Sequence, residues 1–170
     1  MENQLDNLSE EQERPGFLTV LCVLSFISTG FALLSGLFSI FSGPSSEEEM
    51  LEVKVQMTKS ISEMKEIGMT SFVNLLEKLQ AMSEDVNNNY YLATIVGVII
   101  AGVGLFGVIK MWQGYKMGFH IYIIYCIIGV LGAYLYVSPS NIPSFIIIFN
   151  LLISGIFVFM YSRNLGWMRK

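Results

Sequence analysis

Four long uncharged, mostly apolar runs divide the chain, and polar segments that hold nearly all the charges separate them. The runs are 17–42, 90–109, 117–137 and 142–162. Each has about 20 residues or more, enough for a helix to cross the roughly 30 Å hydrocarbon core of a bilayer. Because a helix satisfies its own backbone hydrogen bonds in lipid, the pattern predicts an all-α, polytopic membrane protein whose four spans form a four-helix bundle.

The segment between the first two runs, 43–89, follows a different periodicity. Its apolar positions step by threes and fours, which is typical of an amphipathic helix with an apolar seam. The seam residues that we expect to make contacts are Met57, Ile61, Met64, Phe72, Leu75 and Leu79. Ser46 and Glu49 form a capping-box pattern where this helical block begins.

The length of this helical block limits its shape. A straight helix over 47–86 would measure about 60 Å, yet both ends must return to the same membrane surface. Gly68 is a C-cap candidate followed by N-cap candidates, so we expect the block to fold back there into a helical hairpin. A straight arm that continues the second span is the alternative.

Small residues recur every four positions in two of the runs, where they would let helices approach closely. Asn150 lies near the middle of the fourth run, where its amide must find a partner on another helix. The residues predicted to pack helices together are Ser28, Ala32, Gly36, Ala93, Gly97, Ala101, Gly104 and Asn150.

Basic residues indicate the orientation of the chain. They flank the runs on one side only, in Arg14, Lys110, Lys116 and the tail from Arg163 to Lys170. By the positive-inside rule both termini are cytoplasmic, as is the loop 110–116, whereas the block 43–89 and the turn 138–141 are exported. Residues 1–16 would then form an acidic, disordered cytoplasmic tail and 163–170 a basic one. The acidic start argues against a cleaved signal peptide, so 17–42 is interpreted as a retained span.

Composition narrows the possible partners and cofactors. Residues are 53% hydrophobic and 14% charged, with a net charge of −4 and no basic stripe, so we expect a lipid bilayer as partner and no nucleic acid. Cys22 and Cys126 fall within the runs and form no C-x-x-C pair, which favours small buried side chains over redox chemistry. The methionine spacing in the seam is explained by packing rather than Cu(I) binding. We expect no metal and no other cofactor.

His120 is the only histidine, about one turn inside the third run. A lone titratable group in a membrane is a functional candidate, but at this depth it can simply reach headgroups and water. Without a partner acid in any run, no catalytic constellation is predicted, and we expect that the protein is not an enzyme.

The opening of the first run, Glu-Arg-Pro-Gly-Phe-Leu-Thr-Val-Leu-Cys-Val-Leu-Ser-Phe-Ile-Ser-Thr-Gly over 13–30, resembles the start of small uncharacterised membrane proteins of the Bacteroidota kind. The resemblance covers mainly this run and implies a bacterial inner-membrane setting, without catalytic or binding residues. From the residues themselves we expect an integral membrane scaffold or accessory subunit that binds another membrane protein or a second copy of itself. A small oligomeric channel or transporter is the alternative.

Overall fold

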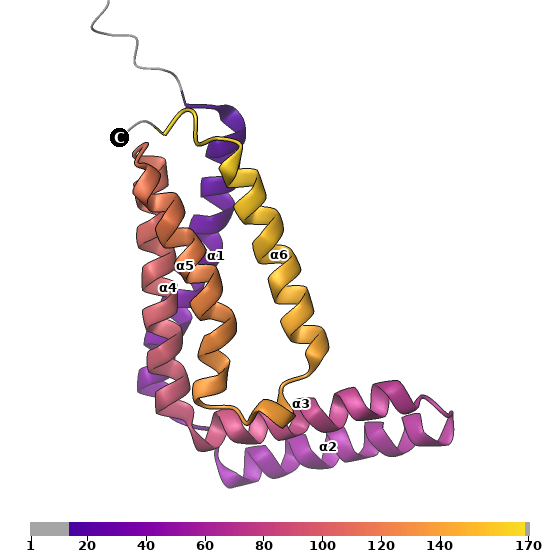
Figure 1. Ribbon diagram of the computed structural model, residues 1–170. Helices are drawn as coiled ribbons and strands as arrows, with labels where there is room; N and C mark the ends of the chain where they lie inside the picture. The colour runs from indigo at the N-terminus through magenta and orange to yellow at the C-terminus, as the bar shows by residue number, and fades with distance from the viewer. Residues whose placement is uncertain (1–13, 169–170) are drawn as a thin grey trace, which may run out of the picture.

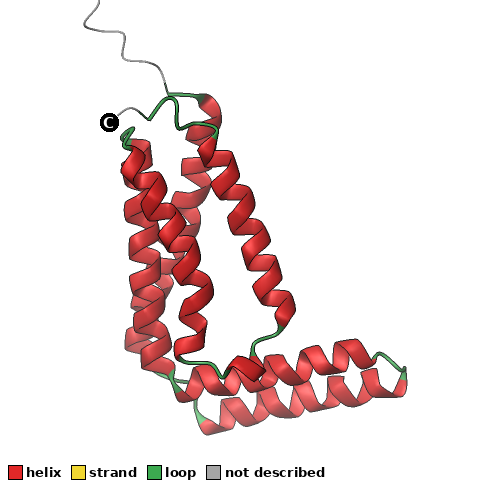
Figure 2. Cartoon of the chain, viewed as in Figure 1, coloured by secondary structure: helices red, strands yellow, loops and turns green. Residues whose placement is uncertain are grey.

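The computed structural model describes residues 14–168, and this part of the chain consists of helices and the turns between them (Figures 1 and 2). The predictions for 1–13 and for Arg169 and Lys170 lie outside the described residues. The elements in chain order are α1 (Gly16–Ser42), α2 (Glu47–Glu66), α3 (Thr70–Asn88), α4 (Tyr90–Trp112), α5 (Lys116–Leu131), η3 (Gly132–Leu135), η4 (Pro139–Asn141) and α6 (Ser144–Ser162).

Four of these helical segments are long and apolar enough to cross a membrane. They are Gly16–Ser42, Tyr90–Trp112, Lys116–Leu135 and Ser144–Ser162, which confirms the prediction of an all-α chain with four apolar helices. The last span begins two residues later than predicted, because Pro143 at its N-cap keeps Ile142 in an extended conformation.

The packing of the apolar helices is uneven. Helix α4 packs closely along both α1 and α5, whereas α6 makes fewer contacts, with α5 and with α1. Figure 1 shows α6 near α1 at the end that holds both termini and leaning away from α5 at the other end. The tightly packed unit is therefore α1, α4 and α5, and the expected four-helix arrangement is open on the side of α6.

The buried core lies toward the end that holds the termini. Its members come from all four apolar helices and from the turn after α6, so this end fixes their relative positions. The buried residues of this core are Leu18, Leu21, Cys22, Val108, Met111, Phe119, Tyr122, Tyr161 and Met168.

Helices α2 and α3 form an antiparallel pair at the opposite end of the molecule. The chain reverses between them at Gly68, whose φ of 75° lies in the left-handed region that favours glycine. Helix α2 starts with the predicted capping box: the Glu49 N–H donates to the Ser46 hydroxyl at 3.2 Å, and the Ser46 N–H donates to the Glu49 carboxylate at 2.9 Å. In Figure 1 the pair lies across the ends of the apolar helices rather than along them.

Candidate functional site

The interior of the α2–α3 hairpin contains most of the predicted seam. Ile61 is buried, and Met57, Met64, Leu75 and Leu79 are partly buried. Phe72 differs, because half of its side chain is exposed.

Val73, which the seam pattern omits, is only 5% exposed. Helix α2 is the helix that packs along α3, so we infer that α2 covers Val73. The apolar residue three positions on, Leu76, is the signal that could have identified this second stripe.

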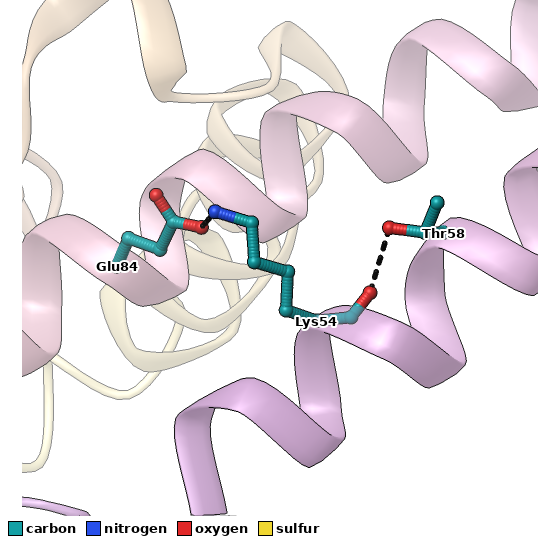
Figure 3. Close-up of polar contacts among 3 residues, drawn as sticks. All are labelled: Lys54, Thr58 and Glu84. Carbon is teal, nitrogen blue, oxygen red and sulfur yellow. Dashed lines mark hydrogen bonds and ion pairs between the residues drawn. The ribbon is translucent and has the colours of Figure 1, made fainter. Parts of the chain in front are cut away.

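Two ion pairs join the helices of the hairpin. The Lys54 ammonium lies 3.1 Å from the Glu84 carboxylate (Figure 3). The Lys65 ammonium lies 3.3 Å from the Glu77 carboxylate. Both pairs are exposed, so each contributes at most about 1 kcal/mol to stability. The pairs also fix the register of the two helices. One joins the start of α2 to the end of α3, and the other joins the end of α2 to the first half of α3.

Side chains at the end of α3 attach the hairpin to the connection between α5 and α6. One Asp85 carboxylate oxygen accepts hydrogen bonds from the Ser138 backbone N–H and the Asn141 amide, each at 2.9 Å. These bonds, that of the Ser138 N–H first, hold the pKa of the Asp85 carboxyl below its ordinary value. The Asn89 amide also donates to the Tyr136 carbonyl at 3.1 Å.

A second attachment joins the hairpin to the exit of α1. The Ser45 N–H donates to the Asn87 side-chain oxygen at 2.9 Å, and the Asn87 amide donates back to the Ser45 carbonyl at 3.3 Å. We call Asp85, Asn87 and Asn89 the attachment residues. The sequence analysis did not identify these residues, because partners 42 to 56 positions away in the chain leave no local signal.

The surface of the hairpin combines acids with exposed apolar side chains. Nine acids and four lysines lie within 47–88, a net charge of −5. At the turn, Ile67 is 69% exposed and Phe72 is 50% exposed, and Leu51 and Val55 on α2 are exposed as well. The described chain provides no partner for these apolar groups.

Of the packing residues predicted in α1, the structure brings Gly36 against a neighbour. A Cβ at Gly36 would lie 2.6 Å from a methyl group of Val98 on α4. Ser28 and Ala32 are instead exposed. The buried face of α1 is the adjoining one, since Ser25 is 3% and Thr29 is 2% exposed.

In α4 the predicted stripe is only partly a packing face. Ala101 and Gly104 are buried, and a Cβ at Gly104 would lie 2.7 Å from the Tyr125 ring on α5. Ala93 is partly buried. A Cβ at Gly97 would meet no atom within 4 Å, so the close packing predicted there is not found within the chain.

The closest approach of two apolar helices is at a pair of glycines. A Cβ at Gly118 on α5 would lie 2.6 Å from the Gly107 carbonyl oxygen on α4. Neither glycine is among the packing residues predicted from the sequence. Gly118 was missed because Gly114, four positions before it, lies in the loop 110–116, and the residue four positions after it is Tyr122.

Tyr161 ties the C-terminal end of α6 to α1. Its hydroxyl donates to the Ser25 hydroxyl at 2.9 Å, and the whole residue is buried. Its ring also lies 4.9 Å from the ring of Tyr122 on α5, in an edge-to-face arrangement. This contact holds α6 in place at one end only.

A cavity of about 370 Å³ lies where α6 leans away from α1 and α5. Its lining includes Asn150, Ser154, Ser28 and Cys126. The Asn150 side-chain oxygen accepts a hydrogen bond from Ser154 at 3.4 Å on the same helix. The interhelical partner predicted for Asn150 is not found in the described chain.

The remaining titratable candidates lie apart from one another. Cys22 is buried in the core and Cys126 lines the cavity, and both are free thiols. His120 is exposed, with its Nδ1 at 3.1 Å from the Lys116 carbonyl oxygen. Within residues 14–168, no group of three or more His, Cys, Asp or Glu side chains is placed to hold a metal.

Comparison of the chain with protein-family models, curated protein sequences and solved structures found no match.

Proposed function

We propose that this protein is an integral membrane scaffold or accessory subunit that acts through the α2–α3 hairpin. The observation that carries the proposal is that the hairpin combines a hydrogen-bonded base with an exposed apolar tip. Hydrogen bonds fix the base of the hairpin to two separate chain segments, at Ser45 and at Ser138. The opposite end of the hairpin presents Ile67 and Phe72 to the surroundings. A rigid base and an apolar tip suit a docking element.

The hairpin is proposed to lie on the exported side of the membrane, with both termini in the cytoplasm. Arg14, Lys110, Lys116 and Arg163 belong to the end of the molecule opposite the hairpin. That distribution agrees with the positive-inside rule, because these basic residues flank the apolar helices directly. The inner membrane of a bacterium is the proposed location.

Alkaline phosphatase fusions test this orientation. A fusion within 60–75 should be active, because the enzyme matures only outside the cytoplasm, whereas a fusion after Lys170 should be inactive. Reversed activities would place the hairpin inside the cell and remove the basis of the proposal.

The proposed partner is another membrane protein or a second copy of this chain. For a partner other than a second copy, the acidic surplus of the hairpin favours a basic rim around an apolar centre that covers the hairpin tip. The surplus also disfavours adsorption to anionic lipid, since helices that lie on such membranes carry Lys and Arg on their polar face.

Replacement of the exposed tip tests the docking role. The double variant Ile67→Gln/Phe72→Gln removes apolar surface outside the buried seam, so the hairpin should remain folded while co-purification of the partner, or the dimer mass in native mass spectrometry, is lost. Gln56→Ala, an exposed change on α2, is the matched control and should keep the wild-type assembly. Unchanged assembly in the double variant would show that the tip is not the docking surface.

A further inference from the structure

The cavity between α1, α5 and α6 lies within the apolar part of the molecule, and Ile100 of α4 also lines it. Its lining on α6 runs from Phe145 to Phe157, about 18 Å along the helix axis. A volume of about 370 Å³ falls in the range of roughly 300–1,000 Å³ typical of small-molecule sites. The site is therefore large enough for a ligand and does not depend on the hairpin.

One polar group in this cavity requires a partner that the described chain does not supply. Asn150 lies six residues into α6, about 9 Å from its start, and is an exposed residue that lines the cavity. Its side-chain oxygen accepts a hydrogen bond from Ser154, but within residues 14–168 its NH₂ group donates none. An unpaired amide in a hydrocarbon environment costs on the order of 1–3 kcal/mol, so an occupant with a hydrogen-bond acceptor would relieve it.

The remaining lining specifies the shape and charge of this occupant. Aromatic rings of Tyr122 and Tyr125 on α5 face the site together with Phe145 and Phe149 on α6. The two phenylalanine rings are nearly parallel, with centroids 5.9 Å apart. Flat rings favour a planar group that can stack against them. No Asp, Glu, Lys, Arg or His lines the cavity, which favours a neutral ligand.

We propose that this cavity binds a neutral, lipid-soluble molecule whose planar head carries hydrogen-bond acceptors, as in an isoprenoid quinone. Asn150 donates to one acceptor of the head, the aromatic side chains stack on its plane, and the apolar tail leaves through the open side next to α6. A phospholipid fits poorly, because its charged head belongs at the membrane surface. An acyl chain alone would leave the Asn150 amide without a partner.

Binding of a short-chain menaquinone to the full-length protein in mild detergent tests the proposal. Native mass spectrometry and quenching of intrinsic fluorescence should give a saturable complex with wild-type protein. Geranylgeraniol, which has an isoprenoid tail but no planar head, should bind more weakly. Asn150→Leu keeps the side-chain size and removes the donor, so the Kd for menaquinone should rise by about three- to tenfold.

A second pair of variants separates ligand loss from misfolding. Gly129 lines the cavity, and a Cβ there meets no atom within 4 Å, so Gly129→Leu should fill the space without disturbing the helices and abolish menaquinone binding. Gly155 on α6 is equally open but does not line the cavity, so Gly155→Leu should bind like wild type. Equal helicity by circular dichroism establishes that both variants are folded.

Four results would overturn the proposal. They are absence of a menaquinone complex with wild-type protein, equal affinity for geranylgeraniol, wild-type affinity in Gly129→Leu, and a wild-type dimer that Asn150→Leu dissociates. The last result would mean that a second copy of the chain, rather than a lipid, satisfies the Asn150 amide. The first three results do not bear on the hairpin. The fourth would assign the dimer contact to α6, and the assembly of Ile67→Gln/Phe72→Gln would then test the scaffold role separately.

Discussion

Replacement of Gly118 by alanine should destabilise the protein more than any other single methyl group added to a glycine of the apolar helices. The new Cβ would lie 2.5 Å from the Met111 nitrogen, 2.6 Å from the Gly107 carbonyl oxygen and 2.9 Å from the Lys110 carbonyl carbon. All three atoms belong to the α4 backbone, so none can rotate away. The two helices must separate to admit the methyl group.

The expected loss of stability in Gly118→Ala can be estimated by comparison with Gly97, where an added methyl group has free space. Overpacking costs about 1–3 kcal/mol, and a contact with rigid backbone belongs at the upper end of that range. Alanine also favours a helix over glycine by up to about 1 kcal/mol, but Gly97→Ala gains the same term without a contact within 4 Å. The difference between the two variants is therefore about 3 kcal/mol, or roughly 6–12 °C in Tm for a chain of this size.

Thermal unfolding in mild detergent, followed by far-ultraviolet circular dichroism, measures this difference. Gly97→Ala should unfold at or slightly above the wild-type temperature, and Gly118→Ala well below it. Equal Tm values would refute the close approach of α4 and α5. The reverse order would restore the expectation, drawn from small-residue spacing, that Gly97 is the contact point.

Two further changes test hydrogen bonds at opposite ends of the molecule. Tyr161→Phe removes the donor to the buried Ser25 hydroxyl and should lower stability by about 1 kcal/mol, whereas Tyr134→Phe at an exposed ring should change little. The pKa of Asp85 is lowered in the folded protein, so its contribution is present at neutral pH and is lost as the pH falls through that lowered pKa. Amide exchange at Ser138, corrected for intrinsic rate, should then accelerate in acid, and Asp85→Asn should show the faster exchange already at pH 7; an unchanged rate would mean that another contact holds the hairpin.

Much of the fold could be predicted because its signals are local. Uninterrupted apolar runs identified four helices long enough to cross a membrane, and the capping box at Ser46 marked the start of α2 to the residue. The reversal of the chain in the structure lies at Gly68, where a glycine is followed by N-cap candidates. Such features depend on periodicity and backbone preference within a few residues.

The contacts between helices could not be predicted as well, because a stripe of small residues does not say which neighbour it faces. Gly97 belongs to the most regular stripe and is open, whereas Gly118, which has no small residue four positions further along its run, packs directly against the α4 backbone. The sequence predicts Ser28 on a packing face of α1. In the structure Ser25, on the adjoining face of the same helix, is the buried residue. The partners of Asp85 are more than 50 positions distant in the chain, so no local pattern indicates them.

The central claim is that the hairpin tip contacts a protein partner on the exported side of the membrane, and photo-crosslinking in intact cells tests it most directly. A photoreactive amino acid at Ile67, which is 69% exposed, should give a discrete adduct whose mass identifies either another membrane protein or a second copy of the chain. The same group at Gln56, exposed on α2 away from the tip, is the control and should give little or none. Absence of a protein adduct from Ile67, or an equal yield from both positions, would contradict the account.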